Sequence, residues 1–193
     1  MESLESLYDI WVTRNPKFEV YFRDGEESKD GLLKKFSDFG TGASEWMEAK
    51  GKTFGAGYEL YIYAFFLGLY YGKKKPLKGK TDVLGHPIKY WGNLENKKGR
   101  KEYSIIREYI FAALVAKTEE LDLIKLEKGD LVAEDAVRML IDNMEEYANK
   151  GFYLMKEKLD EIPDFLFKNT GFLDMILDLV QPSYSHDEEI EEL

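Results

Sequence analysis

A nearly continuous run of apolar residues extends from Tyr58 to Tyr71 and is interrupted only by Glu59 and Gly68. A helix that is apolar on nearly every face is expected at the centre of a core. At about 14 residues the run is shorter than the roughly 20 that are needed to cross a bilayer. The pattern therefore predicts a buried central helix over 57–71 and no transmembrane segment.

Apolar residues recur at helical spacing in three later segments. The first begins at Ser104, whose hydroxyl we expect to act as an N-cap, and extends to about Leu126. The second covers roughly 132–160 and ends before Pro163, and the third covers about 171–180. Each of these helices is predicted to bury one face in the core.

Gly151 lies inside the second of these helices. Glycine in a helix interior costs about 1 kcal/mol relative to alanine, because the chain loses more conformational freedom there on folding. We therefore expect a kink or a close helix contact at this position.

The first 50 residues give weaker patterns. Apolar spacing predicts a helix over 4–11, which the Asn15-Pro16 pair stops. Residues 17–23 alternate in polarity and favour a short strand, although no partner strand is evident. Apolar residues over 32–36 predict another helical turn or two.

Residues 72–102 have no sustained helical period, because seven glycines and prolines interrupt them. A small β-hairpin is expected within 83–91. A connection of about 30 residues is long for a compact domain, and such loops are usually functional or disordered.

These elements predict a mainly α fold class. We expect one globular domain over 1–182, in which about five helices form a bundle around the central aromatic helix. The basic segment 73–101 is a long loop inserted into this domain. Residues 183–193 form an acidic tail that we expect to be flexible. This tail either folds back on the lysines of the basic loop or is a frayed C-terminus that increases solubility.

The charge of the 73–101 loop is opposite to that of the rest of the chain. The loop holds ten Lys or Arg residues against Asp82 and Glu95, a balance of +8, whereas the whole chain carries −10. The remaining residues therefore carry −18 in total. Such a loop either meets a negatively charged partner or is solvated and held against the protein's own carboxylates.

The candidate contact residues lie in this loop, where two clusters of basic residues flank a histidine and two aromatic rings. We predict that binding uses Lys73, Lys74, Lys75, Lys78, Lys80, His86, Tyr90, Trp91, Lys97, Lys98, Arg100 and Lys101. If the loop is only solvated, Tyr90 and Trp91 are instead expected to anchor it to the body of the protein.

Lysines interleaved with aromatic rings are also typical of single-stranded nucleic-acid binding, since cations neutralise phosphates and rings stack on bases. Nine of the ten basic residues are lysines, whereas arginine is the commoner reader of base edges. The negative charge elsewhere repels a polyanion. Nucleic acid is therefore the alternative to a protein partner.

Catalytic chemistry has little support in the sequence. The chain has no cysteine and two histidines, which excludes disulfides, thiolate metal sites and a thiol nucleophile. No familiar catalytic signature is present. A small carboxylate-dependent hydrolase is therefore the most distant alternative, and we predict no metal and no cofactor.

The resulting hypothesis is a non-enzymatic accessory or interaction protein that binds a partner protein through its basic loop. The first five residues are acidic in character and lack the apolar core of a signal peptide. We therefore expect a cytoplasmic location.

Overall fold

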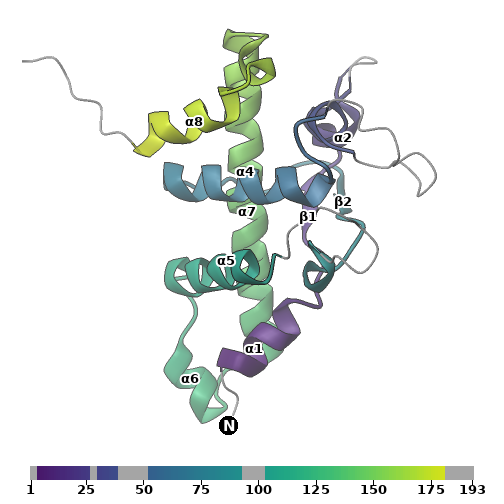
Figure 1. Ribbon diagram of the computed structural model, residues 1–193. Coiled ribbons are helices and arrows are strands. Elements are labelled where there is room, and N and C mark those ends of the chain that lie inside the picture. Colours follow the sequence, from purple (N-terminus) through teal and green to yellow (C-terminus); the bar gives the residue numbers. More distant parts are fainter. Residues whose placement is uncertain (1–3, 27–29, 39–51, 93–102, 181–193) are drawn as a thin grey trace, which may run out of the picture.

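The computed structural model describes residues 4–26, 30–38, 52–92 and 103–180. Over these residues the chain forms eight α-helices, two short strands and two 3-10 turns. In chain order they are α1 (Leu4–Trp11), β1 (Lys17–Glu19), α2 (Tyr21–Asp24), α3 (Leu32–Phe36), α4 (Gly57–Tyr71), β2 (Thr81–Val83), η1 (Ile88–Tyr90), α5 (Ser104–Lys117), α6 (Leu123–Lys128), α7 (Ala133–Glu161), η2 (Phe165–Phe167) and α8 (Gly171–Val180). The predicted mainly α class is confirmed (Figure 1).

The long helix α7 forms the spine of the molecule, and α4 crosses it between α8 and α5 (Figure 1). At the crossing, a side chain on Gly68 would collide with the backbone carbonyl of Tyr147, and one on Gly151 with that of Ala64. The two glycines therefore let the helix backbones approach closely. The predicted close contact at Gly151 is confirmed, and α7 is one continuous helix through this position.

The helix α4 is the centre of the hydrophobic core, as its apolar sequence predicts. Leu60, Tyr61, Phe65 and Leu67 are all fully buried. Each such side chain contributes about 1.5–3 kcal/mol through the removal of apolar surface from water. The core therefore forms around α4 and the α7 face that it contacts.

The structure splits the helix that the sequence predicts over 104–126. The helix α5 ends before Thr118, and α6 begins after Asp122, whose side chain accepts hydrogen bonds of 3.0 Å from the N–H groups of Ile124 and Lys125. Thr118 is buried, and its hydroxyl oxygen accepts from Nδ2 of Asn143 on α7 at 3.2 Å. The prediction is wrong here because a local cap and a tertiary bond override the apolar period.

The N-cap predicted at Ser104 is also wrong. Tyr103 occupies the N-cap position of α5, and no side chain caps the helix there. Ser104 is instead the first helical residue.

The small β element is a two-stranded antiparallel sheet whose strands are far apart in the sequence. The strand β1 pairs with β2, with Phe18 opposite Asp82. The sequence pattern shows no partner strand for β1. The structure provides one, β2, from within the basic loop. The hairpin expected within 83–91 is not formed, since its second half is the 3-10 turn η1. The strand expected over 17–23 is shorter than predicted, because the chain beyond β1 turns into α2.

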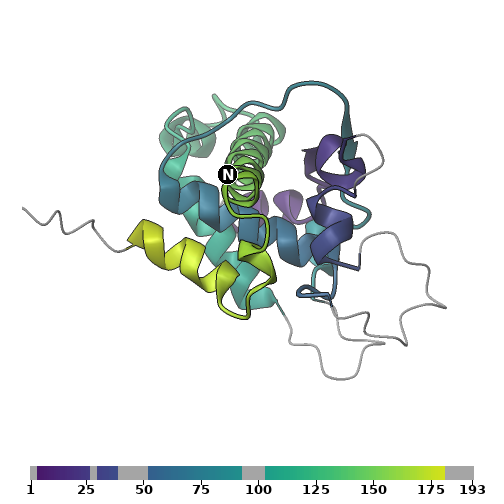
Figure 2. The same cartoon turned by 90° about the horizontal axis from the view of Figure 1, so that it is seen from above.

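Residues 73–80, which we call the strap, connect α4 to β2. The strap crosses α7 on the side opposite α4 (Figure 2). Helix α7 is thereby enclosed between an apolar helix on one face and a lysine-rich segment on the other.

Candidate functional site

The strap is fastened to α7 through its backbone. The N–H of Lys75 donates to the carbonyl oxygen of Glu146 at 3.1 Å. The carbonyl oxygens of Lys75 and Pro76 accept from Nδ2 of Asn149 at 3.1 and 3.2 Å. Asn149 is only 2% exposed, so these bonds are shielded from water. An unsatisfied buried polar group costs about 1–3 kcal/mol, and the strap supplies acceptors for Nδ2 of Asn149, whereas Oδ1 of the same side chain is buried with no partner among the described residues.

Glu19 of β1 holds the far end of the strap. Its carboxylate is 3% exposed and accepts from the N–H of Lys78 at 2.7 Å, Nδ2 of Asn149 at 3.1 Å and the hydroxyl of Tyr153 at 2.9 Å. Three donors around one carboxylate compensate for its lost hydration. Burial, together with the hydrogen bond to Glu19, raises the pKa of Tyr153 to about 12.

Two strap lysines also direct their side chains to α7. Nζ of Lys74 donates to Oδ1 of Asn143 at 2.5 Å and lies 4.0 Å from the carboxylate of Glu146. Nζ of Lys75 lies 3.7 Å from the centroid of the Tyr153 ring, which is a cation–π contact. Lys74 and Lys75 are therefore engaged in the protein's own structure.

The other three strap lysines present their charge to solvent. Lys73, Lys78 and Lys80 are exposed, and no ion pair joins them to the other residues that the structure describes. Nζ of Lys73 lies 5.8 Å from the centroid of the Tyr71 ring. Both hypotheses for the basic loop thus apply to part of the strap: Lys74 and Lys75 contact α7, although Lys74 is also exposed, and the other three lysines face outward.

Tyr90 and Trp91 take opposite positions at the end of η1. Trp91 is fully buried, its ring stacks on Tyr58 with centroids 5.9 Å apart, and its Nε1 donates to the carbonyl oxygen of His86 at 3.1 Å. Tyr90 is 48% exposed, with Nζ of Lys89 lying 5.0 Å from its ring centroid. Trp91 therefore anchors the segment, whereas Tyr90 and the exposed His86 are accessible to a partner.

The second basic cluster, which comprises Lys97, Lys98, Arg100 and Lys101, lies outside the described residues, as does the acidic tail 183–193.

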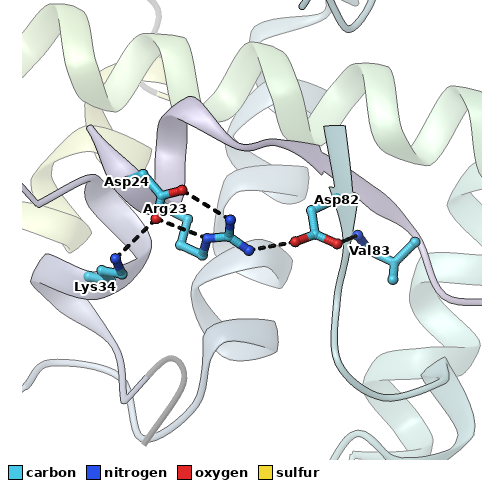
Figure 3. A network of polar contacts seen from close by, with 5 residues as sticks. All are labelled: Arg23, Asp24, Lys34, Asp82 and Val83. Atoms are coloured by element: carbon cyan, nitrogen blue, oxygen red, sulfur yellow. Dashed lines mark hydrogen bonds and ion pairs between the residues drawn. The ribbon is translucent and has the colours of Figure 1, made fainter. Parts of the chain in front are cut away.

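An ion-pair network beside the strap joins β2 to α2 and α3 (Figure 3). Arg23 donates to Asp82 at 2.5 Å and through two nitrogens to Asp24 at 3.0 Å, and Lys34 also donates to Asp24 at 3.0 Å. The hydrogen bonds from Arg23 are the main reason that the pKa of both carboxyls lies below its usual range. The second oxygen of Asp82 accepts from the N–H of Val83 at 2.8 Å. This bond satisfies a donor on the open edge of β2 and limits pairing with another strand.

A second buried carboxylate, Glu145, supports β1 from α7. It is 6% exposed and accepts from the N–H of Lys17 at 2.8 Å. Burial raises the pKa of Glu145. Among the described residues, the buried carboxylate of Glu19 thus joins β1 to the strap, and that of Glu145 joins β1 to α7. Across the described ranges, no group of three or more His, Cys, Asp or Glu side chains is arranged to hold a metal ion.

The residues that fix the strap, namely Glu19, Asn149 and Tyr153, are not among those predicted from the sequence. A signal for Glu19 exists, since it is a charge between Phe18 and Val20 in an otherwise apolar run. Asn149 and Tyr153 lie one helical turn apart. Only the path of the strap shows what these two side chains contact.

None of the helices in the described part of the chain is both long and apolar enough to cross a bilayer. Comparisons of the chain with protein-family models, with curated proteins and with solved structures found no match. The surface of the molecule is therefore the basis for assigning a function.

Proposed function

We propose that this chain is a non-enzymatic, cytoplasmic accessory or interaction protein that binds an acidic segment of a partner protein with the outer surface of the strap. Lys73, Lys78 and Lys80 supply the positive charge. Tyr90, with Lys89 against its ring, supplies an exposed aromatic contact on the same basic segment.

The observation that carries this proposal is the combination of a fixed backbone with outward-facing charge. The strap backbone is held by the buried side chains of Glu19 and Asn149, while Lys73, Lys78 and Lys80 are exposed and form no ion pair with the other described residues. A surface that is already ordered loses less conformational entropy on binding than a flexible loop does. The strap is thus pre-organised to meet carboxylates.

Nucleic acid is the second candidate partner, and the pairing of Lys89 with the exposed ring of Tyr90 favours it. Sequence-independent binding of single strands uses several rings on which successive bases stack. The burial of Trp91 leaves Tyr90 as the exposed ring of the pair. A protein partner therefore ranks first.

The experiment compares two triple variants that change the net charge equally. In one, the exposed strap residues Lys73, Lys78 and Lys80 become Glu; in the control, the exposed residues Lys117, Lys128 and Lys168 become Glu. Lys74 and Lys75 are kept, because they hold the strap. Fluorescence anisotropy measures the affinity for a labelled oligoglutamate peptide and for single- and double-stranded DNA and RNA at about 50 and 200 mM salt.

We expect the strap variant to bind the peptide at least about 10-fold more weakly than the native protein, since each lost exposed ion pair is worth roughly 0.2–1 kcal/mol and each new Glu adds repulsion. The control variant should change the affinity by less than about threefold. Equal losses in the two variants would contradict a specific site. Tight, steeply salt-dependent binding of an oligonucleotide instead of the peptide would favour the nucleic-acid alternative.

A further inference from the structure

Helix α5 is apolar on both of its sides, although only one side contacts the core. Ile110 and Leu114 are fully buried on the inner side. The exposed apolar residues of the outer side are Ile105, Tyr109, Ala112 and Ala116. They follow one another at intervals of four, three and four positions, so they share one face of the helix. We call these four residues the outer face of α5.

The large side chains of the outer face are well exposed. Ile105 is 62% exposed and Tyr109 is 66% exposed. Both lie in the N-terminal half of α5, whereas the two alanines lie in its C-terminal half. The face therefore has a bulky half and a flat half.

This order of sizes is self-complementary. If two copies of α5 lie antiparallel about a two-fold axis between residues 110 and 111, Ile105 lies opposite Ala116 of the second copy. Tyr109 lies opposite Ala112 in the same way. Each large side chain then meets a small one, which permits the close packing that protein interfaces require. We propose that the outer face of α5 forms an antiparallel, two-fold symmetric homodimer.

A parallel arrangement fits the face poorly. It places Tyr109 against Tyr109 and leaves the alanines facing each other across a gap, which forfeits packing contacts. The antiparallel arrangement also places each helix N-terminus beside a C-terminus, so the helix dipoles attract.

The charges beside the face oppose the dimer. Glu108 flanks the outer face and is exposed. In the antiparallel pair the two Glu108 residues lie on the same edge, five positions or about 7.5 Å apart along the helix axis. This separation is shorter than the Debye length of about 10 Å at 0.1 M salt, so the two carboxylates repel each other and added salt should weaken the repulsion.

The size of the face predicts a weak dimer. A helix of 14 residues is about 21 Å long, and one helix pair buries less than the roughly 1,200 Å² of a standard stable interface. Because each copy carries a net charge of −10, salt should strengthen the association. Salt should weaken the binding of an acidic partner to the strap, so the two surfaces respond in opposite directions.

Sedimentation equilibrium tests the dimer with four proteins: the native chain, Tyr109→Ala, Ala112→Tyr, and the double variant that exchanges the two residues. We expect the native chain to dimerise between about 10 µM and 1 mM. Each single variant should weaken the dimer at least about fivefold, one by losing a contact and the other by placing two rings against each other. The double variant should recover most of the affinity, because the reversed order of sizes is again self-complementary.

Circular dichroism checks that all four proteins are folded. A control variant, Leu173→Ala, removes a similarly exposed apolar side chain from α8 and should leave the dimer unchanged. A native chain that stays monomeric up to about 1 mM at both 50 and 500 mM salt would overturn the proposal. So would a folded double variant that fails to recover, since the antiparallel register requires the recovery.

Discussion

The strap and the outer face of α5 depart in opposite directions from what their side-chain polarity predicts. The strap has five lysines among eight residues, yet its backbone is bound to buried side chains of α7 and β1. The outer face of α5 is apolar, yet it is exposed to solvent. The polarity of a segment therefore does not show by itself how the segment lies in the fold, because tertiary hydrogen bonds decide whether its backbone is fixed.

The strongest way to break this comparison is to remove the carboxylate that fastens the strap. We expect Glu19→Ala to lower the free energy of unfolding by about 3 kcal/mol, because Lys78, Asn149 and Tyr153 lose a buried acceptor. Urea denaturation measures this change. The control Glu127→Ala removes an exposed carboxylate from α6 and should alter the free energy of unfolding by no more than about 0.5 kcal/mol.

If Glu19→Ala is as stable as the control, the buried carboxylate is not holding the strap. The strap would then be held only by its hydrogen bonds to Glu146 and Asn149 of α7, and its contrast with α5 would be smaller.

A smaller change in the free energy of unfolding tests whether the outer face of α5 is exposed. At concentrations below about 1 µM, where a weak dimer dissociates, Ile105→Ala should change the free energy of unfolding by no more than about 0.5 kcal/mol, because the side chain is exposed. Ile110→Ala, on the buried side of the same helix, should cost about 2–5 kcal/mol. Urea denaturation of the two variants measures the difference. A cost of more than about 1 kcal/mol for Ile105→Ala in dilute solution would show that the outer face is covered within one copy of the chain.

The helices α4, α7 and α8 were predictable because an apolar period extends through each of them. Gly151 is the most specific success, since a glycine that weakens a helix indicates a close contact, and the contact lies where α4 crosses α7. The break between α5 and α6 was not predicted, although the cap residue Asp122 is visible in the sequence, because the apolar period continues past it.

The candidate site was less predictable than the fold. The pairing of β1 with β2 joins segments about 60 residues apart, and no local pattern specifies such a contact. Tyr90 and Trp91 are neighbours in the sequence, yet one is exposed and the other is buried. The direction in which each side chain points depends on η1 and on the ring of Tyr58, neither of which the sequence pattern reveals.

Amide hydrogen exchange at Lys75 and Lys78 tests most directly whether the strap is a fixed surface. Both N–H groups donate to acceptors on α7 or β1, so we expect them to exchange at least about 100-fold more slowly than in an unstructured peptide. In Glu19→Ala, the protection at Lys78 should fall while the amides of α7 stay protected. Exchange of both amides at the unstructured rate in the native chain would contradict a fastened strap.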